Sequence, residues 1–349
     1  MRAGARRYRF TIAVLAAALV VSVLLGVGLG SVWISPVETV RLFAWKLHLA
    51  GRPDVSRATE VILFQLRLPR VLLAVVVGAG LAVAGTVFQG LFRNPMADPA
   101  VIGVSSGAAL SATAVIVAGG TGALGGLGVP LAAFVGAVAT AFLVYRLARI
   151  GPTVHAATLL LAGIAVAAVV SAAISLVMSF TSQQVQNIYF WLLGGLGGRT
   201  WGSLEAAGGL VAVGVAASFA LAPQLNLVTL GEERAAQLGV ELDRFKRQSL
   251  AVGALLAAAA VSVSGVIGFV GLMTPHLLRL VVGADHRRLM PAVVLAGPTL
   301  LILADLAART AVAPEELPVG AVTAVLGGPF FLYLLRRERG TAAGGLAAA

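Results

Sequence analysis

Three charged side chains at the ends of apolar stretches could bind oppositely charged groups. Arg67 and Arg70 flank a Leu-Pro pair just before one apolar stretch, and Arg309 closes another. A guanidinium group holds a carboxylate through two parallel hydrogen bonds and stays charged at physiological pH. Snorkelling of these arginines to lipid headgroups is the alternative. Asp305 lies one helical turn before Arg309, so an internal pair competes for that arginine.

The sequence lacks the residues that ATP hydrolysis, proton coupling or metal binding would require. A phosphate-binding loop needs a lysine after a glycine, and neither of the two lysines, Lys46 and Lys246, follows one. Asp305 is the one acid well inside an apolar stretch, whereas proton-coupled pumps carry several buried carboxylates or histidines. Cysteine is absent. We therefore expect no catalytic residue, no metal and no cofactor, with the energy source on another subunit.

Composition places most of the chain in lipid. Of 349 residues, 59% are hydrophobic and 11% are charged, whereas about 25% of the residues in a soluble domain are charged. The 42 glycines fit close packing of membrane helices. A net charge of +11 would suggest nucleic-acid binding in a soluble chain. Here we attribute it to basic loops that set membrane orientation, so the expected contact is with lipid and not with nucleic acid.

Apolar stretches of about 20 residues form helices in lipid, because their backbone groups must bond within the segment. We predict an all-α integral membrane protein with about ten transmembrane helices. Their ranges are 11–32, 70–92, 101–119, 129–147, 156–178, 203–222, 249–266, 268–281, 290–308 and 318–335. Four arginines among the first nine residues resemble the start of a signal peptide. The length of the run and the poor cleavage site after it favour an uncleaved span.

The basic residues predict the orientation of these helices. With the N-terminus in the cytoplasm, 17 Lys and Arg residues fall inside and 8 fall outside, which accounts for all 25. This bias puts both termini in the cytoplasm of an inner-membrane protein. Residues 34–66 are expected to form a periplasmic segment, and residues 223–248 a cytoplasmic loop of two short helices around a turn. The whole chain, 1–349, is predicted to be one transmembrane domain.

Four segments carry motifs that resemble a known family. Residues 66–107 contain Leu-Arg-Leu-Pro-Arg and then Gln-Gly-Leu-Phe-Arg-Asn-Pro-Met-Ala-Asp-Pro, and residues 230–240 read Leu-Gly-Glu-Glu-Arg-Ala-Ala-Gln-Leu-Gly-Val. Residues 265–280 contain Gly-Phe-Val-Gly-Leu-Met-Thr-Pro-His, and residues 305–331 contain Glu-Leu-Pro-Val-Gly. In order and spacing they closely resemble the FecCD-type permeases, membrane subunits of bacterial ATP-binding-cassette (ABC) importers for ferric siderophores, haem and cobalamin. The resemblance implies the inverted-repeat fold of a type II ABC importer permease.

The resemblance makes residues 230–240 the loop that docks into a groove on the ATPase subunit. They show a helix–Gly–helix pattern with two early acids, where a helix N-terminus favours negative charge. An ordinary solvated loop is the alternative. The residues expected to couple the chain to the ATPase are Gly231, Glu232, Ala235, Leu238 and Gly239.

The resemblance also implies a gate at the cytoplasmic mouth of the pathway. Two prolines within five residues cannot continue a helix, so the second and third spans must meet in an irregular turn. A similar interruption is expected at Pro275 in the eighth span, and His155 begins another inner loop that would complete the gate. A plain interhelical turn is the alternative. The candidate gate and pathway residues are Gln89, Asn94 and Met96.

By the same resemblance, Arg67, Arg70 and Arg309 receive acidic residues of a substrate-delivery protein. The expected partners are a second copy of the permease, which gives a homodimer, two ATP-binding subunits, and a periplasmic or lipid-anchored substrate-binding protein. Ferric siderophore is the first choice of cargo, followed by haem and cobalamin. An ion-coupled secondary transporter and an intramembrane enzyme are remote alternatives, because the spans carry few groups for ion coupling or acid–base chemistry.

Overall fold

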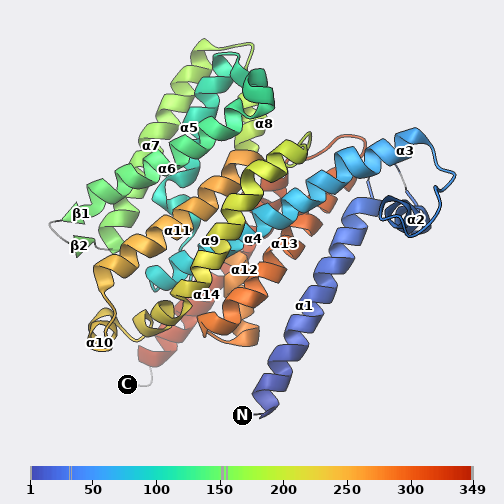
Figure 1. Ribbon diagram of the computed structural model, residues 1–349. Helices are drawn as coiled ribbons and strands as arrows, with labels where there is room; N and C mark the ends of the chain where they lie inside the picture. The colour runs from blue at the N-terminus through green and yellow to red at the C-terminus, as the bar shows by residue number, and fades with distance from the viewer. Residues whose placement is uncertain (1, 31, 33, 151–152, 155, 347–349) are drawn as a thin grey trace.

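Each stretch predicted to span the membrane is helical in the computed structural model, which describes residues 2–30, 32, 34–150, 153–154 and 156–346. Figure 1 shows these helices: α1 (Arg2–Gly28), α4 (Leu68–Leu91), α5 (Val104–Val117), α6 (Gly128–Ala148), α7 (Ala156–Phe180), α9 (Trp201–Val228), α11 (Leu242–Ser264), α12 (Val270–Val282), α13 (His286–Thr310) and α14 (Val319–Leu346). Within the described residues, seven helices are long and apolar enough to cross a membrane. Helix α5 with the bent 3-10 segment η3 (Gly120–Gly126) makes an eighth, whereas α12 and the apolar part of α14 are shorter.

Short elements connect these helices. They are α2 (Pro36–Lys46), α3 (Arg57–Val61), the π-helical turn η1 (Ile62–Arg67), the 3-10 turn η2 (Pro99–Ile102), the antiparallel strands β1 (Arg149–Ile150) and β2 (Thr153–Val154), α8 (Val185–Leu193) and α10 (Glu232–Gln237). Apart from these two short strands, the regular structure of the described residues is helical, which confirms the predicted fold class.

The second span begins earlier than predicted. Elements α3, η1 and α4 run on as one helical stretch from Arg57 to Leu91. Pro69 lies inside it, and in a regular helix its ring would clash with the carbonyl four residues earlier. The wider π-helical turn η1 directly precedes this proline and changes the register of the hydrogen bonds there. Residues 57–66, the last part of the predicted outer segment 34–66, therefore belong to this helix.

Helix α4 is the centre of the bundle. It packs against α13, α11, α9 and α12, and most of its residues are buried. Small residues permit this packing, because a Cβ added to Gly78 or Gly297 would overlap the backbone of the facing helix. Helix α1 lies at the edge of the bundle, where it packs mainly on α13 (Figure 1).

The break between the seventh and eighth spans lies at residues 265–269, where Phe269 has a left-handed φ of 68°. Helix α12 then continues through Pro275, so the interruption expected at that proline was wrong. Pro275 has no N–H with which to bond the carbonyl of Gly271 four residues earlier. The oxygen of that carbonyl faces Gly85 on α4, where the absence of a side chain makes room for it.

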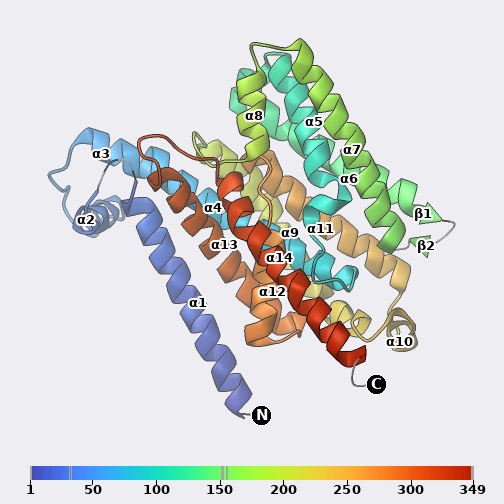
Figure 2. The same cartoon turned by 180° about the vertical axis from the view of Figure 1, so that it is seen from behind.

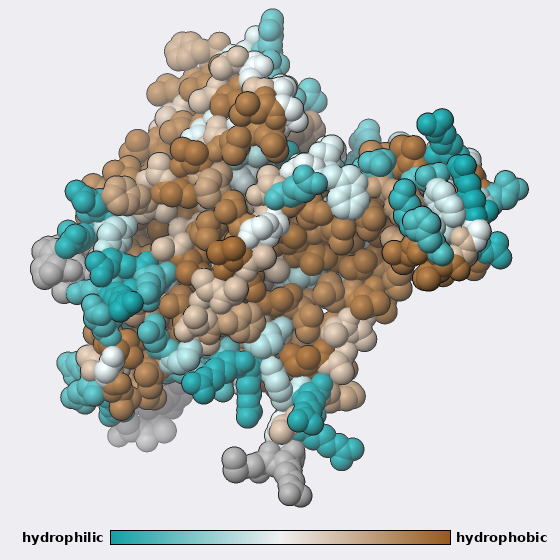
Figure 3. Space-filling model, viewed as in Figure 1, coloured by the Kyte–Doolittle hydropathy of each residue, from teal (hydrophilic) through white to brown (hydrophobic). Residues whose placement is uncertain are grey.

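Polar groups gather at two ends of the bundle. Helix α1 begins and α14 ends on the side of α10, whereas α2 and α3 lie at the opposite end (Figures 1 and 2). Figure 3 shows a hydrophobic band between hydrophilic groups at these two ends. This arrangement agrees with the prediction that both termini lie on one side of the membrane. That this side is the cytoplasm stays a prediction.

Gly85→Ala should destabilise the chain, because the new methyl group would overlap the carbonyl oxygen of Gly271. Overpacking of this kind costs about 1–3 kcal/mol. Gly209→Ala on α9 is the matched control, since nothing lies within 4 Å of its added Cβ and it gains the same helix propensity. Thermal unfolding of both purified variants in detergent measures the difference. Equal stabilities would contradict the close approach of α4 and α12.

Candidate functional site

An ion cluster, buried except at Glu316, joins α4, α13 and the segment before α14, at the end of the bundle that carries α2 and α3. The Nη2 atom of Arg70 lies 2.9 Å from Oδ1 of Asp305, and its Nη1 atom lies 2.8 Å from Oε2 of Glu316. One turn after Asp305, the Nε atom of Arg309 lies 3.5 Å from Oδ2. Asp305 is only 1% exposed, so its charge depends on these two guanidinium groups.

Arg67 and Arg309 also cap the C-terminal end of α1. The last carbonyls of a helix have no partner within the helix. Arg67 donates hydrogen bonds to the carbonyls of Val27 and Gly28, with N···O distances of 3.2 and 2.8 Å. Arg309 donates to the carbonyl of Gly26. The two arginines thereby hold α1 against the rest of the bundle.

The three arginines predicted to dock a delivery protein are thus engaged inside the chain. Arg67, Arg70 and Arg309 are each less than a tenth exposed. An acidic residue of a partner would have to compete for their N–H groups with the end of α1 or with Asp305. Their role in docking stays a prediction, whereas the contacts above give each of them a structural role.

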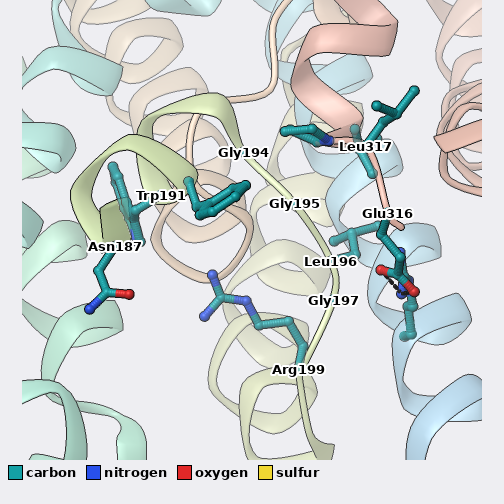
Figure 4. A pocket seen from close by; sticks show the side chains of 13 residues that line it. Asn187, Trp191, Gly194, Gly195, Leu196, Gly197, Arg199, Glu316 and Leu317 are labelled. Atoms are coloured by element: carbon teal, nitrogen blue, oxygen red, sulfur yellow. Dashed lines mark hydrogen bonds and ion pairs between the residues drawn. The ribbon is translucent and has the colours of Figure 1, made fainter. Parts of the chain in front are cut away.

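A cavity of about 350 Å³ lies beside the ion cluster. Arg70 and Glu316 contribute to its lining, together with Asn187 and Trp191 of α8. Figure 4 shows the guanidinium group of Arg199 directed toward Asn187 and Trp191. Its Nε atom has no hydrogen-bond partner within the described part of the chain. Burial lowers the pKa of the Arg199 guanidinium from its ordinary value.

Sequence reasoning missed Arg199, which it counted only as one of the basic residues outside. The available signal was its position directly after the turn Gly194-Gly195-Leu196-Gly197-Gly198. Gly194 has a φ of 67°, and a Cβ there would overlap the carbonyl of Val266, so this turn packs closely on the break between α11 and α12. Chemically, Arg199 adds a cation to the lining of this cavity, and its unpartnered Nε–H group is buried.

The predicted gate residues lie together where α4 ends. Gln89 is 2% exposed; its Nε2 donates to the carbonyl of Leu272 at 3.1 Å, and its Oε1 accepts from Arg279. These bonds tie α4 to α12. The Oδ1 atom of Asn94 accepts a hydrogen bond from the backbone N–H of Met96 at 2.9 Å, which shapes the irregular turn. The turn is confirmed, whereas the gate role of the three residues stays a prediction.

A second polar contact at this end joins α9 to α13 and was not found by sequence reasoning. The side-chain oxygen of Asn226 accepts from the backbone N–H of His286 at 2.8 Å, and its amide nitrogen lies 2.6 Å from Oδ1 of Asp285.

His155, which would complete the predicted gate, lies outside the described residues.

Helix α10 protrudes from the bundle at the end that carries both termini (Figure 1). Gly231 and Gly239 bracket it with φ values of 108° and 89°, which glycine adopts without steric cost. Ala235 is fully buried and anchors the helix, whereas Leu238 is 60% exposed. The structure therefore brings the five predicted coupling residues into one projecting element.

A salt bridge fixes α10 to α11, with 2.8 Å between Oε2 of Glu232 and Nζ of Lys246. The prediction of two short helices in residues 223–248 was wrong for the second of them. That helix is the first part of α11, because no glycine or proline separates it from the apolar run that follows. Helix α9 likewise continues through Pro223 to Val228, so α10 is the one short helix in this described segment.

Apolar helices packed around the central helix α4, with α10 projecting at one end, describe a multi-span membrane protein. The FecCD transport family matches residues 18–337. The chain belongs to this family, as its motifs predicted.

Three curated relatives are similar over most of the chain. The cobalamin import system permease protein of Halobacterium salinarum is 48% identical over 282 residues, which cover 81% of this chain and 75% of that protein. The hemin transport system permease protein of Yersinia pestis is 47% identical over 282 residues, covering 80% and 84%. The Fe(3+)-citrate import system permease protein of Bacillus subtilis is 37% identical over 333 residues, covering 95% and 96%.

A solved structure has the same fold. It is described as an inward-facing conformation of a metal-chelate type ABC transporter, with a TM-score of 0.79 and 31% identity over 93% of this chain and 98% of that chain. The chain is therefore a multi-span permease of the ABC importer class, and the predicted fold is confirmed at this level.

Arg70→Gln should destabilise the chain by about 3–5 kcal/mol, because the buried carboxylate of Asp305 loses its bidentate partner. Arg244→Gln is the control, since its 3.9 Å pair with Glu241 is exposed and should contribute less than about 1 kcal/mol. Chemical unfolding in detergent measures both losses. Adding Asp305→Asn to Arg70→Gln should restore part of the stability, because the buried carboxylate is then neutral. If Arg70→Gln alone were as stable as Arg244→Gln, the cluster would not be what holds α4 to α13.

Proposed function

We propose that two copies of this chain form the translocation pathway of an ABC importer that carries a metal chelate across the inner membrane. The match of residues 18–337 to the FecCD transport family supports this most, together with the likeness to a metal-chelate type ABC transporter. Two ATP-binding subunits supply the energy, because this sequence has no phosphate-binding loop. A periplasmic or lipid-anchored substrate-binding protein delivers the cargo at the end that carries α2 and α3.

The cargo is proposed only as a metal chelate. The relatives at 48% and 47% identity are named for cobalamin and hemin, and one at 37% for ferric citrate. Corrinoid and haem cargoes therefore rank beside the ferric siderophore that the sequence first suggested. Cargo affinity belongs to the delivery protein in this scheme, because a pathway that must release its cargo binds it weakly.

Helix α10 is the element that we propose to couple ATP hydrolysis to the spans. Ala235 is buried and Glu232 is paired with Lys246, so the helix is held on α11 and on the end of α9. The side chain of Leu238 remains available to a partner. A short helix fixed at both ends passes on a displacement of its docking partner as a rigid element.

Leu238→Glu should weaken binding of the ATP-binding subunits about tenfold or more, because it places an unpaired charge in an apolar contact. The fold should tolerate the change, since the side chain is 60% exposed. Leu47→Glu is the matched control, at 64% exposure near the opposite end of the bundle. Co-purification of the ATPase with each variant measures the effect. Equal retention of the ATPase by both variants would remove Leu238 from the coupling surface.

Transport itself is tested in lipid vesicles that contain the chain with its ATPase and delivery protein. We expect ATP-dependent uptake of at least one among labelled cobalamin, haem and a ferric siderophore, and no uptake when the ATPase is left out. Uptake that persists without the ATPase under an ion gradient would support a secondary transporter. If the complex hydrolyses ATP but takes up none of the three cargoes, the proposed metal-chelate cargo is wrong, while the proposed importer is not contradicted.

A further inference from the structure

An apolar groove runs between α6 and α11 on the side of the bundle. It has a volume of about 570 Å³, and hydrophobic side chains such as Phe134, Val138 and Leu255 line nearly all of it. Two polar side chains, Tyr145 and Arg247, also line it. Tyr145 lies near the end of α6 that leads to β1, and Arg247 lies near the start of α11, which follows α10. These two helix ends lie at the same end of the bundle (Figure 1). We call this site the α6–α11 groove.

The groove has the length of one half of a bilayer. From Arg247 to Leu255 the rise along α11 is about 12 Å, and from Phe134 to Tyr145 along α6 it is about 17 Å, at 1.5 Å per residue. Half of the hydrocarbon core of a bilayer is about 15 Å thick. The apolar part therefore spans one leaflet, with its polar end at the surface on the side of α10.

The lining of the groove suits a hydrocarbon chain. Apart from Tyr145 and Arg247, the residues that line it are apolar. A flexible acyl chain has no polar group that needs a hydrogen-bond partner, so it can follow such a groove along its length.

Positive charge surrounds the polar end. Arg146 lies over the ring of Phe142, a lining residue, with 5.8 Å between its Cζ atom and the ring centroid. Arg146 and Arg247 are both exposed, and within the described residues no salt bridge engages either of them. Asp243 lies one turn before Arg247 on α11 without forming an ion pair with it. Two guanidinium groups are thus left for an anion at the mouth of an apolar groove.

We propose that the α6–α11 groove binds an anionic phospholipid, with one acyl chain along the groove and the phosphate held by Arg247 and Arg146. Basic pockets between transmembrane helices on the cytoplasmic side recognise anionic headgroups. Guanidinium groups suit phosphate because they donate two parallel hydrogen bonds. A zwitterionic lipid of the same chain length would fill the groove but would gain less from the two arginines.

The test uses the purified full-length chain in detergent, with native mass spectrometry to count bound lipid. Dioleoyl phosphatidylglycerol should bind more tightly than dioleoyl phosphatidylcholine, which has the same acyl chains. Arg247→Gln should lower the affinity for phosphatidylglycerol about fivefold, as expected for one basic residue at a lipid surface, and leave phosphatidylcholine unchanged. Arg234→Gln on α10 is the matched control, exposed at the same end of the bundle but outside the groove.

A second variant tests the groove without changing its charge. Ala251 is an exposed lining residue, so Ala251→Phe should fold normally and lower the affinity for both lipids by blocking the acyl chain. Equal affinity of the unmodified chain for the two lipids would overturn the proposal, as would an equal loss with Arg234→Gln and Arg247→Gln. Undiminished binding to Ala251→Phe would also overturn it. None of these measurements depends on transport, so a negative result would contradict the lipid site without contradicting the proposed importer.

Discussion

The bilayer core offers no water to a backbone carbonyl or to a charge, and this constraint explains the contacts on which the bundle depends. Helix α1 ends with carbonyls that no residue of its own can bond, and Arg67 and Arg309 reach them from η1 and α13. The positive charge of Arg309 is tolerated near the membrane because Asp305 lies one turn before it. Asp305 compensates Arg70 and Arg309, and Glu316 completes the set from the loop. A single network thus satisfies the backbone of one helix and fixes two others.

Hydropathy was sufficient to predict where the long helices lie, because the backbone of an apolar stretch in lipid must form its hydrogen bonds within the stretch. It was insufficient at the prolines. Pro69 and Pro275 both lie inside continuous helices, although the sequence indicated a boundary near one and an interruption at the other. A helix tolerates proline when its surroundings accommodate the altered hydrogen bonding. Here a π-helical turn precedes Pro69, and Gly85 makes room for the carbonyl of Gly271, and neither feature follows from a local pattern.

Among the candidate sites, too, features set by a local sequence pattern were predictable, and features set by contacts between distant segments were not. Helix α10 was predictable because two glycines in its own segment determine where it begins and ends. The arginines were predicted by type but not by partner: Asp305 and Arg309 are neighbours on one helix, yet the shorter contact of Asp305 is with Arg70, 235 residues away. Arg199 was missed because its cavity is assembled from α8, a glycine turn and the segment around Glu316. Only the folded chain brings these together.

Helix α4 links the two ends of the molecule mechanically. Arg70 and Gln89 are 19 residues apart on it, a rise of about 28 Å, which nearly equals the hydrocarbon thickness of a bilayer. At one end α4 is clamped to α13 by the ion cluster, and at the other to α12 by the hydrogen bonds of Gln89. Helices α9 and α11, which carry α10 between them, pack along its length. Close-packed helices shift as units and do not deform continuously, so the coupling proposed for α10 would require α9 and α11 to move against a helix whose far end is held by buried charge.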